Sequence, residues 1–231
     1  MAQFPRLEVL NRIVQIGMMP VFYHSDAQVA CEVALACAAG GAATFEFTNR
    51  GDSAIDVFKT IVQAGRDRAR NLIVGAGSIT DEATAALFVA HGANFIVGPS
   101  FNPAVARFCN RRKIPYLPGC LTPTEIATAE ESGVEIVKLF PCESVGGANF
   151  VKALLGPSPG TRIMPTGLSN INQETVSEWF AAGIVAFGIG RELIKKEFLD
   201  ARDFPALTRR AEEILGWVRQ ARSPGEKSTA S

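Results

Sequence analysis

Short apolar runs alternate with amphipathic helical segments along almost the whole chain, and this alternation limits the possible fold more than any other feature. Eight runs are expected to be strands, at residues 18–23, 43–48, 72–75, 94–97, 114–117, 134–141, 162–165 and 184–187. Strands that alternate with helices form a parallel sheet covered by helices. Eight such units in 231 residues fit a closed (β/α)8 TIM barrel better than an open doubly wound sheet.

The helices expected between these strands complete a single domain over residues 1–222. They cover residues 4–16, 26–40, 53–68, 80–91, 104–111, 124–132, 148–155, 173–182, a segment beginning at Glu192, and 204–218. The first is an extra N-terminal helix, and the last is an extra C-terminal helix. Residues 223–231 are expected to form a flexible tail.

Charge and cysteine content exclude several classes of protein. The 23 basic and 23 acidic residues balance, so there is no net basic field for nucleic acid. The five cysteines form neither a CxxC motif nor a Cys/His cluster with metal-ligand spacing, so we expect reduced thiols, no metal and no other cofactor. There is no signal-peptide pattern, and no apolar run reaches the roughly 18 residues of a membrane helix. We therefore expect a cytoplasmic protein whose partners are small molecules and copies of itself.

One expected strand ends in a charge. Lys138 interrupts the apolar run of residues 134–141, and burying a lone ammonium is costly. A desolvated lysine loses basicity and becomes a usable nucleophile. A structural lysine paired with a carboxylate explains the same pattern, because structural ion pairs also perturb lysines. The run by itself leaves both interpretations open.

A carboxylate on another strand is the expected partner. Side chains alternate along a strand, so Phe45 and Phe47 suit the layer between sheet and helices and turn Glu46 into the barrel. The same alternation places Ile136 and Lys138 on one face. Both charges would then lie near the carboxyl ends of the strands, where barrel active sites are found. A structural pair would be closed and packed, whereas a functional pair would border an open pocket.

Six segments in one order carry a family resemblance. They are residues 44–50 (TFEFTNR), 75–79 (GAGSI), 95–99 (FIVGP), 118–125 (PGCLTPTE), 138–141 (KLFP) and 164–167 (MPTG). Over about residues 8 to 200 the chain resembles the 2-keto-3-deoxy-6-phosphogluconate (KDPG) aldolase and 4-hydroxy-2-oxoglutarate (KHG) aldolase family. The resemblance implies a homotrimeric (β/α)8 class I aldolase that needs no metal and interconverts pyruvate plus an aldehyde with a 2-keto-4-hydroxy acid.

The resemblance also implies roles for individual residues. Lys138 matches the lysine that forms the Schiff base, an electron sink for cleavage of a carbon–carbon bond. Glu46 matches the general acid/base, and Arg50 matches the arginine that binds the pyruvyl carboxylate. Ser78 stands where the family commonly has threonine. The full set of implied substrate-binding residues is Arg50, Ser78, Pro99, Phe140, Thr166, Gly167, Gly190 and Arg191.

The sequence departs from the family where the far end of the substrate would bind. Many relatives have a second glycine after the seventh strand and a serine after the eighth, where backbone amides cradle a phosphate. Here Leu168 and Arg191 take these places. A leucine is expected to crowd a phosphate, while an arginine brings an anion-binding fork. We expect a phosphorylated or terminally carboxylated keto-deoxy sugar acid.

Two functions from different classes stay open at this point. One is the aldolase, for which oxaloacetate decarboxylation through the same imine is a conceivable side activity. The other is a noncatalytic barrel that binds a sugar acid or phosphate, with Lys138 and Glu46 as a structural ion pair. His24, at the end of the first strand, is expected to be a polar rim residue rather than a substrate ligand.

Overall fold

The computed structural model describes residues 2–223, and strands alternate with helices throughout this part of the chain. The strands are β1 (Met18–Phe22), β2 (Thr44–Thr48), β3 (Ile73–Gly77), β4 (Ile96–Val97), β5 (Tyr116–Leu117), β6 (Gly119–Cys120), β7 (Val137–Leu139), β8 (Ile163–Pro165) and β9 (Phe187–Ile189). The helices are α1 (Arg6–Ile16), α2 (Ala27–Ala39), α3 (Ala54–Arg68), α4 (Glu82–Ala90), α5 (Pro103–Arg112), α6 (Pro123–Glu131), the 3-10 helix η1 (Glu143–Val145), α7 (Gly147–Leu155), α8 (Gln173–Ala181), α9 (Lys196–Asp200) and α10 (Phe204–Arg222). Beyond Ser223, the expected tail lies outside the described residues.

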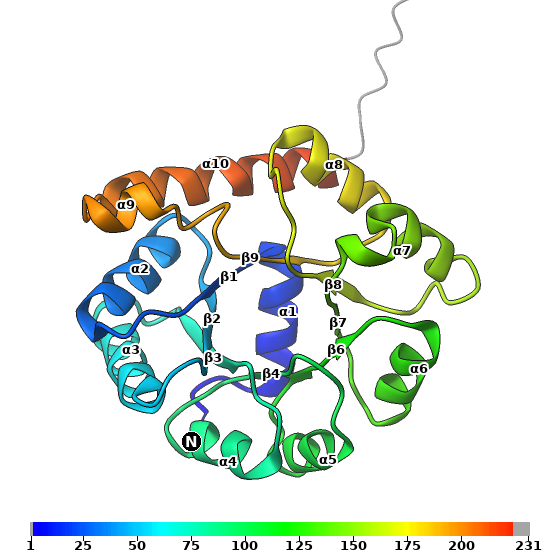
Figure 1. Cartoon of the computed structure of the whole chain (residues 1–231), viewed down its shortest axis with the longest axis horizontal. Helices are drawn as coiled ribbons and strands as arrows, with labels where there is room; N and C mark the ends of the chain where they lie inside the picture. Colours follow the sequence, from blue (N-terminus) through cyan, green and yellow to red (C-terminus); the bar gives the residue numbers. More distant parts are fainter. Residues whose placement is uncertain (1, 224–231) are drawn as a thin grey trace, which may run out of the picture.

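The strands form a curled parallel sheet around the middle of the molecule, with helices outside it (Figure 1). One section has the strand order β5-β4-β3-β2-β1-β9, and the other has the order β6-β7-β8. Only Pro118 separates β5 from β6, and an isolated parallel bridge from Thr166 to Gly188 connects the ends of β8 and β9. The predicted α/β fold with a parallel sheet is confirmed.

Several expected boundaries are shifted, and two of these shifts have local reasons. The strand expected over 114–117 continues past Leu117 as β6, and Pro118 interrupts the ladder because proline has no N–H to donate. The helix expected from Glu192 begins instead at Lys196. Before it the chain makes a turn, in which the backbone carbonyl of Gly190 accepts two hydrogen bonds from the amides of residues 193 and 194.

Apolar side chains form two layers, one on each face of the sheet. Phe45, Phe47 and their equivalents pack between the sheet and the outer helices. The inner layer lies against α1, which crosses the centre of the curled sheet in Figure 1. Its members are Val9, Leu10, Ile13, Met19, Ile73, Phe95, Val97, Leu117, Ile136, Met164 and Ala186. The alternation predicted for β2 and for the strand of Lys138 is therefore confirmed, and Lys138 lies one layer above the apolar floor that includes Ile136.

Helix hydropathy and the state of the cysteines are both defined within residues 2–223. None of their helices has both the length and the apolar character needed to cross a bilayer. All five cysteines are buried free thiols, namely Cys31, Cys37, Cys109, Cys120 and Cys142.

A buried asparagine attaches the segment before α1 to the sheet. The Oδ1 atom of Asn94 accepts hydrogen bonds from the amides of Gln3 and Phe4, at 2.8 and 3.1 Å. Its Nδ2 atom donates to the carbonyls of Val74 and Gly92, at 3.1 and 3.2 Å. The Asn94 side chain therefore anchors the segment before α1 to the sheet, and α1 in turn packs against the inner apolar layer.

We expect Asn94→Ala to lower the free energy of unfolding by about 2 to 4 kcal/mol, because four hydrogen bonds of a buried amide are lost together. Urea or thermal unfolding measures this loss. Asn71→Ala, at an exposed turn, is the matched control and should leave stability nearly unchanged. Equal midpoints for the two variants would contradict the role given to Asn94.

Candidate functional site

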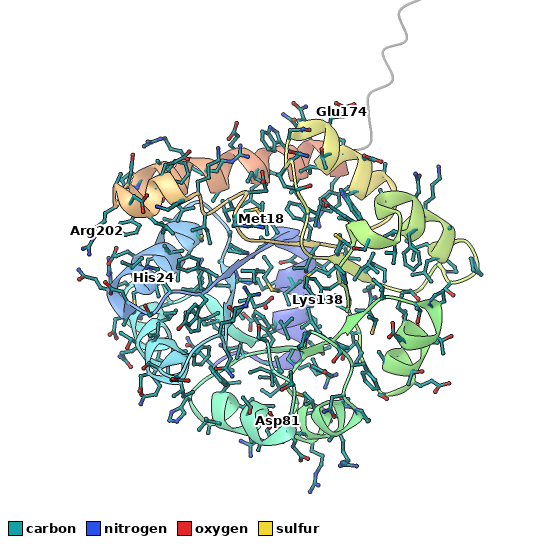
Figure 2. All side chains as sticks on the ribbon, viewed as in Figure 1. Met18, His24, Asp81, Lys138, Glu174 and Arg202 are labelled. Atoms are coloured by element: carbon teal, nitrogen blue, oxygen red, sulfur yellow. The ribbon has the colours of Figure 1, made fainter. Side chains whose placement is uncertain are left out.

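Lys138 and Glu46 come from separate strands, and both are buried. Lys138 is in β7, in register with Gly119 of β6 and Met164 of β8. Glu46 is the middle residue of β2. Their exposed fractions are 6% and 1%, and Figure 2 shows the Lys138 side chain in the centre of the molecule. The prediction that both residues face the interior is confirmed.

These two charges do not form a closed ion pair. Neither residue takes part in any ion pair formed within residues 2–223. The Oε2 atom of Glu46 is buried and has no hydrogen-bond partner, and the Nζ atom of Lys138 lies 4.9 Å from the centre of the Phe140 ring. A purely structural pair would satisfy its charges by direct contact. The geometry therefore favours the functional interpretation.

Burial and charge act in opposite directions on the carboxyl group. Burial of Glu46 raises its pKa above the ordinary value, while Lys138 and Arg50 oppose this rise through their positive charges. Burial is the larger effect, so the carboxyl group keeps its proton to a higher pH than an exposed glutamate does. A raised pKa of this kind suits a general acid/base, which must both release and accept a proton.

Arg50 and Ser78 lie on two adjacent turns above Glu46. Arg50 is exposed and follows β2, and its amide donates to the carbonyl of Thr48 at 3.0 Å. Ser78 is half-buried and follows β3, with a left-handed φ of 59°. The amide of Asn49 donates to the carbonyl of Gly77 at 2.8 Å and holds the two turns together. A cation and a hydroxyl thus lie at the same edge as the buried carboxylate.

Phe140 and Pro99 border the lysine on its other sides. Phe140 is 37% exposed, and its ring lies over Gly167, 3.7 Å from where a side chain on that glycine would begin. Pro99 is exposed, and its backbone lies against Gly119, the residue in register with Lys138. Both residues are exposed at the rim of the interior.

The remaining expected residues gather at the ends of β8 and β9. Thr166 is buried, its Oγ1 atom has no hydrogen-bond partner, and its side chain lies over Gly188. Gly167 is exposed with φ of 90°, and Gly190 is half-buried with its Cα beside the backbone of Val21. Arg191 is exposed. The structure therefore brings a buried hydroxyl and an accessible guanidinium to one side of the site.

The sequence predicts that Leu168 crowds a bound phosphate, and this expectation is wrong. It is only 9% exposed and packs in the outer apolar layer, so its side chain points away from the interior instead of crowding a ligand there. A leucine in this place therefore contributes to core packing.

Glu143 was not anticipated from the sequence. Its Oε1 atom accepts hydrogen bonds from the amide and the hydroxyl of Ser169, at 2.7 and 2.8 Å. This contact ties the turn after β7 to the turn after β8, and so joins the loops that carry Phe140 and Gly167. Nothing in the spacing of the two residues, 26 positions apart, signals the contact.

His24 lies toward α2, away from Lys138 at the centre of the molecule (Figure 2). Its Nδ1 atom accepts a hydrogen bond from the amide of Asp26, the residue that caps α2. This geometry supports its interpretation as a polar rim residue. Within the described residues, histidine, cysteine and carboxylate side chains form no group of three that could hold a metal ion.

Comparison with known proteins finds relatives along almost the whole chain. The family model described as KDPG and KHG aldolase matches residues 9–210. The 2-dehydro-3-deoxy-phosphogluconate aldolase of Pseudomonas aeruginosa is 30% identical over 91% of this chain and 92% of its own length. That of Haemophilus influenzae is 28% identical over 92% of this chain and 97% of its own length.

A solved structure has the same fold. It is the KDPG aldolase of Legionella pneumophila, with pyruvate captured as a covalent carbinolamine intermediate. It matches with a TM-score of 0.79 and 24% identity, over 88% of this chain and 96% of that one. The match to the family model and the long alignments with named aldolases show that this chain belongs to the KDPG and KHG aldolase family, whose members are pyruvate-dependent class I aldolases.

Proposed function

We propose that the chain cleaves a 2-keto-3-deoxy-6-phospho sugar acid, or a related 2-keto-4-hydroxy acid, to pyruvate and an aldehyde through a Schiff base on Lys138. One observation carries this proposal. A buried amine and a buried carboxyl group share one interior without a direct ion pair, and one carboxylate oxygen has no partner at all. The covalent carbinolamine of the Legionella pneumophila enzyme supports an amine as the reacting group.

The reaction begins when the unprotonated Lys138 amine attacks the keto carbon of the substrate. The carboxyl group of Glu46 protonates the hydroxyl group of the carbinolamine, which leaves as water, and the resulting protonated imine withdraws electrons from the adjacent carbon. Glu46 then accepts the proton of the C4 hydroxyl, the C3–C4 bond breaks, and its electron pair moves into the imine to give an enamine. The aldehyde leaves. Glu46 returns the proton to the enamine carbon, and hydrolysis releases pyruvate and the free amine.

The pyruvyl end of the substrate is held beside the reacting carbon. Arg50 supplies a planar fork for the carboxylate, and Ser78 adds a hydroxyl donor from the adjacent turn. Pro99 and Phe140 supply apolar surface at the rim and limit access of water to the imine. The same set of groups would also bind oxaloacetate, which makes its decarboxylation a side activity to measure.

The far end of the substrate is an anion in this proposal. Arg191 binds it with its guanidinium, while Thr166, Gly167 and Gly190 shape the space between Arg191 and Lys138. The guanidinium group of an arginine can donate paired hydrogen bonds to either a phosphate or a carboxylate. We therefore infer a substrate with one of these two groups at its distal end.

We also propose that the curled sheet closes as a (β/α)8 barrel and that three chains assemble as a homotrimer. The register supports closure, because β5 and β6 follow one line interrupted at Pro118 and the bridge from Thr166 to Gly188 joins the last two strands. The homotrimer rests on the family resemblance. The runner-up function, a noncatalytic sugar-acid-binding barrel, requires a closed Lys138–Glu46 pair and is disfavoured by their geometry.

Borohydride reduction in the presence of pyruvate tests the covalent step. We expect a stable adduct with the mass of reduced pyruvate on Lys138, because only an imine is trapped by this reagent. Lys138→Arg should form no adduct while keeping its charge and its fold. Circular dichroism checks the fold, and Lys152→Arg, on the surface of α7, is the matched control. A folded wild-type protein without an adduct would support the noncatalytic alternative.

Glu46→Gln tests the role of the carboxyl group. We expect kcat to fall by roughly 10² to 10⁴, because positioned acid/base help is lost. In the wild type, the rate of cleavage should fall as the pH drops through the raised pKa of Glu46, because protonation removes the base. This acid limb of the pH profile should be absent in the variant.

The same variant should be more stable than the wild type at neutral pH. Because burial raises the pKa of Glu46, the folded protein binds more protons than the unfolded chain between the ordinary and the raised pKa, and stability is lost as the pH rises through this window. A neutral glutamine avoids that loss. A gain of about 1 kcal/mol would raise Tm by roughly 2 to 4 °C. A gain that is equally large at low pH, where Glu46 is protonated, would contradict the explanation.

Cleavage rates for matched substrates test the distal anion. We expect kcat/KM to be highest for a phosphorylated or dicarboxylate substrate and to fall roughly tenfold or more for the neutral analogue, since a charge-assisted hydrogen bond contributes about 1.5 to 3 kcal/mol. Arg191→Ala should remove most of this preference. Arg202→Ala, exposed at the end of α9, is the control that should preserve it. Equal rates with all three substrates would refute a tuned anion site.

A further inference from the structure

Two glycines of β3 leave room for different neighbours. Gly75 and Gly77 are both buried, and both have ordinary strand backbones that any residue could adopt. A side chain on Gly75 would collide with the ring of Phe95 in the inner apolar layer. A side chain on Gly77 would collide with the carboxyl group of Glu46, with its Cβ only 2.6 Å from Cδ and 2.7 Å from Cγ. The space above Gly77 is therefore occupied by the acid/base group itself.

The register explains how the carboxyl group reaches this place. Glu46 is in register with Gly75, and Thr48 is in register with Gly77. The Glu46 side chain consequently leans along the sheet, toward the carboxyl end of β3 and the turn that carries Ser78. Only a residue without a side chain at position 77 leaves this path open.

Shape fixes the carboxyl group more than hydrogen bonding does. Its Oε2 atom is buried without a hydrogen-bond partner. Lys138 and Arg50 attract the carboxylate through their charges, but neither forms an ion pair with it in the described part of the chain. The carboxyl group of Glu46 therefore packs against the backbone of Gly77.

We propose that Gly77 is a positioning residue for the reaction, because the absence of its side chain places the Glu46 carboxyl group within reach of the substrate bound to Lys138. This inference rests on the proposed role of Glu46. A methyl group at position 77 would displace the carboxyl group, because its Cβ would lie 2.6 Å from Cδ of Glu46, closer than two such carbon atoms can approach. A misplacement of about 1 Å can cost roughly 10² in rate, since proton transfer needs the donor and acceptor in hydrogen-bond reach.

Gly77→Ala is the direct test. We expect kcat for cleavage to fall by roughly 10², and the acid limb of the pH profile to move because the carboxyl group has a new environment. The borohydride adduct of pyruvate on Lys138 should still form, since the amine is untouched. Gly65→Ala, where the new Cβ would meet Leu72 at an ordinary 3.6 Å inside α3, is the matched control and should keep both kcat and the pH profile.

The double variant Gly77→Ala/Glu46→Ala separates a local effect from general damage. Removing the Glu46 side chain removes the collision, so the double variant should be no slower than Glu46→Ala and should regain the thermal stability that Gly77→Ala loses. If Gly77→Ala does not fold, the double variant should fold, which supports the inference. Failure of both to fold would overturn it, because the collision would then involve more than Glu46.

The outcomes also distinguish this inference from the function on which it rests. A Glu46→Gln variant with full activity would refute the role of Glu46 and the inference together. A slow Glu46→Gln variant beside a Gly77→Ala variant with unchanged kcat and pH profile would refute only the positioning role of Gly77.

Discussion

A carboxyl group and an amine that are both buried, yet not in contact, are the constraint on which the rest of the structure depends. Removing Glu46 and Lys138 from water costs free energy, and the missing direct contact leaves much of that cost uncompensated. Such an arrangement persists only when the surrounding backbone is rigid. Here the parallel ladders of β2 with β3 and of β7 with its two neighbours supply that rigidity. The desolvation cost of Glu46 and Lys138 therefore falls at the site where a bound substrate can supply new polar contacts.

The fold separates this polar layer from the apolar one beneath it. Helix α1 and the inner residues at the start of the strands fill the interior below Lys138, so that side no longer admits water. Toward the carboxyl ends, Phe140 and the turn of Arg50 form a rim that remains exposed. In the proposed function, a keto acid would reach the amine from this exposed rim, with its carboxylate near Arg50. Orientation of this kind is a large part of what an enzyme contributes to rate.

Local periodicity made part of this site predictable. Alternation along a strand assigned Phe45 and Phe47 to the outside and Glu46 to the inside, because a period of two depends only on neighbouring residues. Contacts between distant segments could not be read in this way. Glu143 accepts a hydrogen bond from Ser169, 26 positions away in sequence, and Leu168 packs in the outer apolar layer, and neither contact follows from the pattern of neighbouring residues.

Leu168 turns outward, so of the two departures expected at this end of the site only Arg191 is exposed. Backbone amides bind an anion from fixed positions, whereas an exposed arginine must first lose rotamer freedom, at a cost of up to about 2 kcal/mol. It recovers this cost through charge-assisted, bidentate hydrogen bonds that suit a planar carboxylate as well as a tetrahedral phosphate. A site of this kind discriminates by charge more than by shape. In the proposed function, breadth at the distal end is thus compatible with strict geometry at Lys138, because Arg191 would bind the distal anion and Arg50 the pyruvyl carboxylate.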